Sequence, residues 1–312
     1  MFHNGLDDNL LAWLLQGDVS IQYQVYRDLL ETEKPELWKA IHTEGWAKQF
    51  LELQQENGHW GLGWYRPKWT CTHYTLLMLK YLQPIKDIPS ITSIVNQCLD
   101  KQKCADGGFS FWKDYKHSDI CVDGMVLNYA SYFVPPDKRM NSVIDMFLSS
   151  QMQDGGWNCR YLHKAVHGSF HTSLSVLEGL WEYRQNGGTY RLAELTKAEN
   201  KCIEFLMVHH LYLSHQTMEP VDYKMSLFSY PPHWHYDVLK ALYHLAERKL
   251  SYDPRLKEAL ELLKHKRDAE GKWKLQNRHA GAMLFHMEKV GHPSRWNTLR
   301  ALRVLAHFNP DM

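Results

Sequence analysis

Apolar side chains recur at intervals of three and four residues along almost the whole chain, which is the spacing of amphipathic helices. No stretch alternates apolar and polar residues as a half-buried strand does. One set of predicted helices has polar or aromatic starts and covers residues 20–30, 69–79, 119–127, 167–177, 233–242 and 294–302. A second set alternates with the first and covers residues 9–15, 36–53, 89–102, 140–151, 192–210 and 254–266.

Glycine-containing turns that end in an aromatic residue join the two sets. They are Gly58-His59-Trp60, Gly107-Gly108-Phe109, Gly155-Gly156-Trp157 and Gly271-Lys272-Trp273. The turns recur about every 50 residues, with one unit having lost the motif near residues 214–220. We expect the four aromatic side chains to pack between repeats. Gly155 and Gly156 are expected to adopt backbone conformations that a β-carbon disfavours.

Six helical hairpins of this kind predict an all-α protein with a single domain over residues 1–312. Closure of the hairpins into an α/α toroid would place the second helix of each pair on the inside. The starts of these inner helices are rich in His, Trp, Asp and Cys, which favours a shared central cavity. The open alternative is an α-solenoid.

The turn at residues 151–157, Gln-Met-Gln-Asp-Gly-Gly-Trp, resembles the QW motif of squalene–hopene cyclases and the matching turns of protein prenyltransferase β subunits. The resemblance covers the chain from Gln22 to Leu305. It implies the toroid fold and an enzyme that acts on a hydrophobic substrate, such as an isoprenoid, in the central cavity. Because one fold hosts many chemistries, the site residues have to carry the function.

Asp119-Ile120-Cys121 resembles the Asp-x-Cys zinc motif of the prenyltransferase β subunits. The resemblance implies a third ligand at the start of the next inner helix, His171, and hence zinc as cofactor. Asp119, Cys121 and His171 would leave a fourth position open, as a catalytic zinc requires. Cys159 and His167 are alternative ligands. Counted from Gly107 and Gly155, Asp123 and His171 occupy the same position in their repeats.

The same segment also allows acid catalysis, because Asp119 and Asp123 lie four residues apart on one helix face. Class II terpene cyclases place their protonating Asp-x-Asp-Asp motif at an equivalent helix start, whereas this chain has Asp-Ile-Cys-Val-Asp. The catalytic candidates are Asp119, Asp123, His73 and His235. The alternative is that one aspartate caps the helix and the other is solvated.

Five histidines fall at or near inner-helix starts and are expected to converge on one rim of the cavity: His73, His167, His171, His233 and His235. Trp69, Trp112 and Trp234 precede or open inner helices, and their ring faces could stabilise a substrate cation. Arg295 could bind an anionic group of the substrate.

Composition narrows the possible functions. Of the 312 residues, 44% are hydrophobic and 23% charged, as in a globular protein. The formal charge of +1 does not indicate the basic surface that nucleic-acid binding requires. Apolar runs such as residues 10–15 are far shorter than the ~20 residues of a membrane span. Acidic residues stand where a signal peptide has Lys or Arg, so a cytoplasmic location is expected. The six cysteines are then expected to be free thiols or metal ligands.

Two other functions remain open. A carbohydrate-active enzyme would need paired carboxylates across the cavity, for which Asp119, Asp123 and Asp237 are the candidates. A non-catalytic scaffold would hold a ligand or a peptide in the same cavity.

Overall fold

The computed structural model describes residues 7–112 and 116–308, and these residues form an all-helical protein. Within these ranges β-pairing is limited to isolated bridges, such as that between Lys103 and Phe109, and no β-strand forms. No helix in the described ranges is long and apolar enough to cross a membrane. The prediction of an all-α protein is confirmed.

The helices with polar or aromatic starts all form close to their expected positions. They are α2 (Val19–Asp28), α5 (Thr72–Leu82), α7 (Ile120–Phe133), α9 (Phe170–Gln185), α11 (Val238–Glu247) and α13 (Arg295–Phe308).

The alternating set forms as well, with the predicted helix over residues 36–53 divided in two. Its members are α1 (Asp8–Leu15), α3 (Pro35–Ala40), α4 (Gly45–Glu52), α6 (Pro89–Lys101), α8 (Asn141–Ser150), α10 (Leu192–Val208) and α12 (Lys257–His265). Short 3-10 helices cover Lys138–Met140, Tyr161–His163, Tyr223–Ser226 and Pro254–Leu256.

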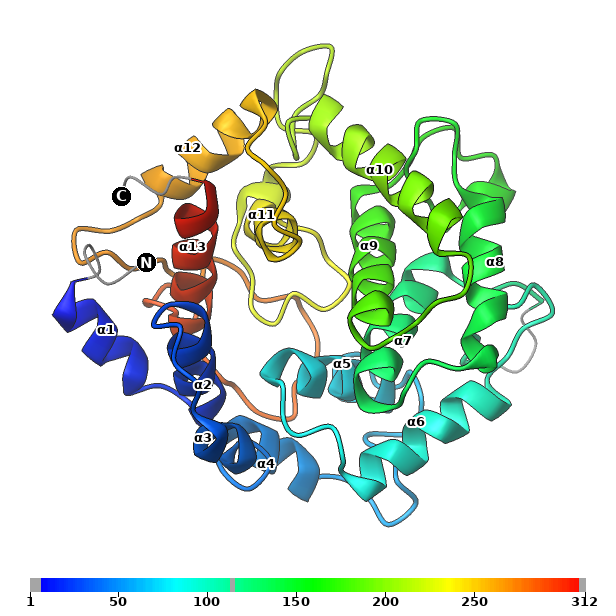
Figure 1. Ribbon diagram of the computed structural model, residues 1–312, viewed down its shortest axis with the longest axis horizontal. Coiled ribbons are helices and arrows are strands. Elements are labelled where there is room, and N and C mark those ends of the chain that lie inside the picture. Colours follow the sequence, from blue (N-terminus) through cyan, green and yellow to red (C-terminus); the bar gives the residue numbers. More distant parts are fainter. Residues whose placement is uncertain (1–6, 113–115, 309–312) are drawn as a thin grey trace.

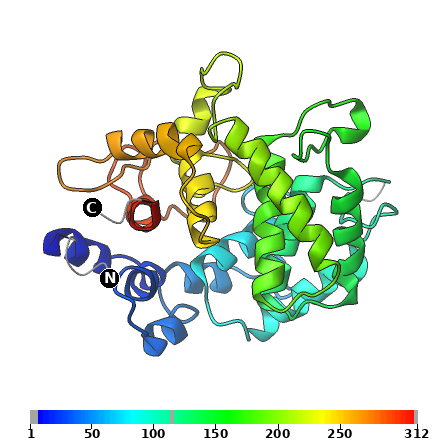
Figure 2. The same ribbon diagram turned by 45° about the horizontal axis from the view of Figure 1, so that its top comes forward.

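The two sets occupy different places in the molecule. Figure 1 shows α1, α4, α6, α8, α10 and α12 along the periphery, and the other set, from α5 to α13, nearer the centre. Successive inner helices pack together in the pairs α5–α7, α7–α9 and α11–α13, and α13 also packs against α2. The last inner helix therefore lies next to the first, and the tilted view in Figure 2 shows the same neighbours.

Helices α7 and α9 approach each other most closely, because glycines face each other between them. A β-carbon on Gly124 would lie 2.5 Å from the carbonyl oxygen of Ser175, and one on Gly179 would lie 2.4 Å from that of Gly124. The two backbones are thus in direct contact, with no room for a side chain at these positions.

Side-chain caps fix the starts of several inner helices, α9 and α11 among them. Ser169 accepts a hydrogen bond from the Thr172 N–H at the start of α9, and Asp237 accepts one from the Lys240 N–H at the start of α11. Each cap satisfies an amide that has no partner within the helix.

Buried indoles tie three of the turns to the helices that precede them. The Nε1–H groups of Trp60, Trp157 and Trp273 donate to the carbonyl oxygens of Phe50, Phe147 and Leu263 at 2.7, 2.8 and 2.7 Å. Each acceptor lies in the second half of a peripheral helix, α4, α8 or α12. All three tryptophans are fully buried, so these bonds are shielded from water.

The same turns are held from the other side by the first turn of the following inner helix. The backbone N–H groups of Trp60, Trp157 and Trp273 donate to the hydroxyls of Thr72, Ser173 and Thr298 at 3.1, 2.9 and 3.0 Å. In the second repeat the Phe109 N–H donates to the Asp123 carboxylate at 2.6 Å. All four aromatic side chains are buried; their packing between repeats stays a prediction.

These bonds correct the predicted register of Asp123 and His171. Asp123 holds the turn residue Phe109 in the way that Ser173 holds Trp157. Asp123 therefore corresponds to Ser173, and His171 corresponds to Cys121. The count from the glycines was wrong by two residues because the two turns reach their inner helices through loops of different length.

The two glycines of the third turn are required for different reasons. Gly155 has the expected positive φ of 89°, and a β-carbon there would lie 2.4 Å from the carbonyl oxygen of Lys201. The expectation for Gly156 was wrong, because its φ is not positive. Its β-carbon would instead lie 2.8 Å from the Cα of Gly168, so close approach of the backbone explains this glycine.

Gly155 and Gly187 form a matched pair for a stability test. Gly187 has a φ of 90° and no atom within 4 Å of an added β-carbon. Gly187→Ala should lower the free energy of unfolding by about 1–2 kcal/mol, the cost of a left-handed alanine. Gly155→Ala should cost about 2–5 kcal/mol, since overpacking against α10 is added. Urea denaturation measures both free energies of unfolding. Equal decreases for Gly155→Ala and Gly187→Ala would contradict the close contact between this turn and α10.

Candidate functional site

Aromatic and imidazole rings from distant parts of the chain gather at the amino-terminal ends of the inner helices. His233 stacks on Trp69 with ring centres 4.1 Å apart, and His235 stacks on His279 at 3.5 Å. Trp234 stacks on His235 at 3.8 Å, and the ring of His171 lies 5.8 Å from that of His235. We call this group the rim cluster; its members are Trp69, His171, His233, Trp234, His235 and His279.

Two members of the rim cluster have an unusual backbone. Trp69 and His233 both have positive φ angles, 75° and 48°. Such conformations are unfavourable for residues with a β-carbon and persist where the surrounding structure imposes them, often at functional sites. Here they bring the indole of Trp69 and the imidazole of His233 face to face.

Several buried nitrogen atoms in and beside the rim cluster have no hydrogen-bond partner among the described residues. They are Nε2 of His73, both ring nitrogens of His233, Nε1 of Trp234 and Nε2 of His279. Buried polar atoms are nearly always paired, and an unpaired one costs roughly 1–3 kcal/mol. This concentration of unpaired atoms makes the rim cluster the candidate site.

The histidines of this region are uncharged at neutral pH. Burial lowers the pKa of His73 to about 3 and that of His171 to about 4, the latter helped by the charge of Lys240. Burial and the neighbouring histidines lower the pKa of His235 to about 3. Burial likewise lowers the pKa of His279 to about 4 and that of His233 well below its usual range. The site therefore presents neutral imidazoles, which donate or accept hydrogen bonds without carrying charge.

A cation already lies against the indole faces of the rim cluster. The ammonium of Lys68 lies 4.9 Å from the ring centre of Trp69 and 5.3 Å from that of Trp234. The rings of Trp69 and Trp234 thus provide the attraction for positive charge that the sequence suggested for them.

Two thiols form a pair near the start of α7: Cys121 lies in its first turn, and Cys159 lies in the loop that follows the turn at residues 155–157. The backbone N–H of Cys121 donates to Sγ of Cys159 at 3.2 Å, and the Thr172 hydroxyl forms a hydrogen bond with the same sulfur at 3.5 Å. The hydrogen bond between the two thiols is the largest cause that lowers the pKa of Cys159. None of the six cysteines forms a disulfide, as expected.

Two of the expected zinc ligands belong to different groups: Cys121 belongs to the thiol pair and His171 to the rim cluster. Cys121 faces Cys159, whereas Nδ1 of His171 accepts a hydrogen bond from the Tyr236 N–H at 2.8 Å. Within the described residues no group of three or more His, Cys, Asp and Glu side chains is arranged to hold a metal ion. As they lie here, Asp119, Cys121 and His171 do not make a zinc site, and zinc stays a prediction.

The two aspartates of α7 differ in their surroundings. Asp123 is fully buried, and its oxygens accept hydrogen bonds from the Phe109 N–H and the Ser118 hydroxyl, both at 2.6 Å. These bonds give Asp123 a part in holding the turn together. Asp119 precedes α7 without a side-chain cap bond, and burial raises its pKa. Of the two, only Asp119 has a carboxyl group without a described hydrogen bond.

The remaining predicted residues are distributed over three places. His73 lies beside the rim cluster among the rings of Tyr65, Tyr74 and Phe111, and the ring of Trp112 lies 4.7 Å from that of Tyr65. His167 lines an open surface groove with His163, His209 and His215. Arg295 lies apart from the rim, where its Nε–H donates to the carbonyl oxygen of Trp13 at 2.7 Å.

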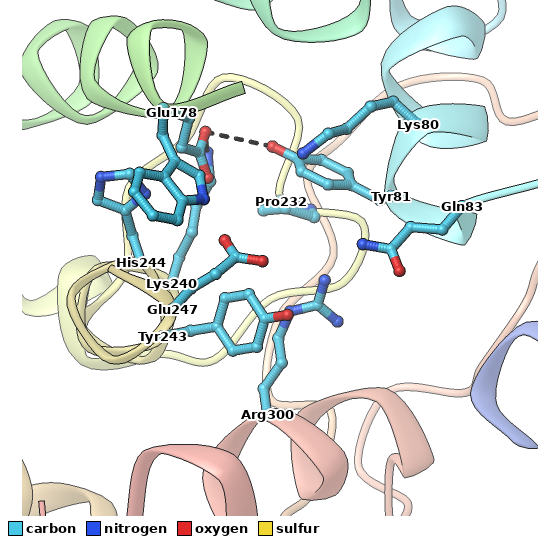
Figure 3. Close-up of a pocket in the computed structure, with 11 residues that line it drawn as sticks. Lys80, Tyr81, Gln83, Glu178, Pro232, Lys240, Tyr243, His244, Glu247 and Arg300 are labelled. Atoms are coloured by element: carbon cyan, nitrogen blue, oxygen red, sulfur yellow. Dashed lines mark hydrogen bonds and ion pairs between the residues drawn. The ribbon is translucent and has the colours of Figure 1, made fainter. Parts of the chain in front are cut away.

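A separate cavity lies between α5, α9, α11 and α13, and sequence reasoning missed every residue that lines it. Figure 3 shows Lys80, Glu178, Lys240, Tyr243, Glu247 and Arg300 around this space. One feature of the sequence could have indicated this cavity: a charged residue within the apolar part of an inner helix, such as Lys80 between Leu79 and Tyr81. The loop before α11 joins the two regions, because Pro232 lines the cavity and His233 belongs to the rim cluster.

Compared with known protein families, with curated proteins and with solved structures, the chain shows no match. The candidate site is therefore defined by its own geometry.

The neutral histidines predict how stability depends on pH. Because the pKa of His73 is about 3 in the folded protein and about 6.5 in the unfolded chain, protons bind preferentially to the unfolded chain between these values. Its contribution to stability is complete above pH 6.5 and is lost as the pH falls towards 3. Together with His171, His235 and His279, it should make the free energy of unfolding decrease steeply below pH 6.5.

His73→Phe should make this dependence shallower by about 1.4 kcal/mol per pH unit between pH 4 and pH 6, because one proton is no longer taken up. Urea denaturation at several pH values measures the slope. The control is His292→Phe, where the side chain is exposed to solvent. Equal slopes for wild type and His73→Phe would show that His73 is not held neutral.

Proposed function

We propose that this chain is an α/α toroid of six hairpins and an enzyme that holds a largely hydrophobic substrate against the rim cluster. The resemblance to squalene–hopene cyclases and prenyltransferase β subunits suggests this class. The contact of α13 with α2 supports closure of the inner helices into a ring. The repeated indole bonds of Trp60, Trp157 and Trp273 support a common hairpin unit.

The observation that carries the proposed function is the set of buried, unpartnered ring nitrogens within a cluster of aromatic faces. A substrate in contact with this cluster would bury apolar surface on Trp69 and Trp234. It would also offer polar groups to the nitrogens of His233 and His279. The neutral imidazoles add no fixed positive charge to the site, which suits a substrate that develops positive charge itself.

The proposed reaction is protonation of an alkene or an epoxide. Asp119 is the acid in this proposal, since both oxygens of Asp123 already accept hydrogen bonds. Transfer of the Asp119 proton to an alkene carbon leaves a carbocation, which the faces of Trp69 and Trp234 would stabilise. Loss of a different proton from the cation to a neutral imidazole, such as His235, ends the reaction. No step depends on zinc.

A pair of probes that differ in charge tests this proposal. Farnesol carries the hydrocarbon alone, whereas farnesyl dimethylamine is protonated at neutral pH and imitates the cation. Isothermal titration calorimetry should show tighter binding of the amine to the wild-type protein. Trp234→Leu should weaken binding of the amine by roughly ten-fold, since a desolvated cation–π contact is worth about 1–2 kcal/mol. Binding of farnesol should change less.

The matched control is Trp38→Leu, which removes an indole from the peripheral helix α3 and should leave both affinities unchanged. Equal binding of the two probes by the wild-type protein, or equal losses in both variants, would count against a cation-stabilising site at the rim cluster.

A further inference from the structure

The cavity between α5, α9, α11 and α13 differs from the rim cluster because its walls are charged. Lys80, Lys240 and Arg300 contribute three cations, and Glu178 and Glu247 contribute two carboxylates. The centre of a water-sized molecule can occupy about 30 Å³ of the space between the walls, so the cavity admits only a small molecule. Charged groups are rarely placed inside a protein without partners.

Most of these charges are paired within the protein. The ammonium of Lys80 lies 2.8 Å from the carboxylate of Glu182, and that of Lys240 lies 3.0 Å from Glu178. Glu178 also accepts a hydrogen bond from the Tyr81 hydroxyl at 3.3 Å. The two lysines therefore belong to ion pairs that form part of the cavity wall.

Arg300 is the cation that remains. Its guanidinium lies 3.7 Å from the ring centre of Trp296 and 4.8 Å from that of Tyr243, so both contacts that hold it are with ring faces. Its Nη1 is buried and has no hydrogen-bond partner among the described residues. The neighbouring Arg303 is already paired with Asp28 at 3.0 Å. Figure 3 shows the guanidinium of Arg300 directed into the cavity.

Glu247 is the corresponding anion. Its carboxylate faces the same space in Figure 3 and forms no hydrogen bond or ion pair with any described residue. Burial raises the pKa of Glu247, although the charges of Arg303 and Lys80 act in the opposite direction. Arg300 and Glu247 thus have opposite charges on one cavity without forming an ion pair.

We propose that this cavity binds a small zwitterion of the α-amino-acid type, with its carboxylate on Arg300 and its ammonium on Glu247. A simple anion would satisfy Arg300 but would meet the carboxylates of Glu178 and Glu247. A simple cation would satisfy Glu247 but would meet Lys80, Lys240 and Arg300. A zwitterion satisfies both unpaired groups, and the edge of a guanidinium matches a carboxylate with two parallel hydrogen bonds. This site is independent of the function proposed for the rim cluster.

Calorimetric titration of the wild-type protein with four probes tests the assignment. Glycine and L-alanine carry both charged groups, whereas acetate and methylammonium each carry one. The amino acids should bind at least roughly ten-fold more tightly than either single-charge probe, as expected for one additional charged hydrogen bond. Amino acids that bind no more tightly than acetate and methylammonium would overturn the assignment, and this comparison needs no variant.

Two substitutions then separate the two ends of the ligand. Glu247→Gln should weaken glycine binding by roughly ten-fold and strengthen acetate binding, because a repelling carboxylate is removed. Arg300→Gln should weaken the binding of both. Glu261→Gln, on the exposed face of α12, is the control and should change neither. Folded Glu247→Gln protein with an unchanged ratio of glycine to acetate affinity would also overturn the proposal.

Discussion

At three places in the protein a buried turn residue that is hydrogen-bonded on two sides joins a peripheral helix to the inner helix that follows it. In three repeats an indole donates to a carbonyl of the preceding peripheral helix, while the backbone amide of the same tryptophan donates to the first turn of the following inner helix. A peripheral helix and its inner helix are thereby joined through one residue. Because these groups are buried, breaking either bond would leave an unpaired polar atom inside the protein.

The positions at which four of the inner helices begin depend on this interaction. The first turns of α5, α7, α9 and α13 are each tied to a turn residue, so their amino-terminal ends are placed in a repeating manner. This brings Cys121 of α7 and His171 of α9 into register, each two residues before the side chain that accepts the turn amide. The same interaction explains the role of Asp123. Its carboxylate accepts the hydrogen bond of the Phe109 N–H, as the Ser173 hydroxyl accepts that of the Trp157 N–H.

Much of this arrangement could be predicted from the sequence, and the rest could not for identifiable reasons. Helix positions follow from apolar spacing, and the packing of Trp157 follows from the repeated Gly-aromatic turn. The role of Asp123 was ambiguous because an acidic side chain at a helix start serves as an acid or as a hydrogen-bond acceptor. Arg300 and Glu247 were missed because they come from separate helices, and only the tertiary structure places them on one cavity.

Hydrogen–deuterium exchange of Trp157→Phe, followed by mass spectrometry, tests most directly whether the turn residue couples the two helices. Phenylalanine fills most of the space but cannot donate to the Phe147 carbonyl. The coupling predicts faster exchange both in the last turn of α8 and in the first turn of α9, with α12 unchanged. Faster exchange confined to the turn around residue 157, with both helices as protected as in the wild-type protein, would contradict it.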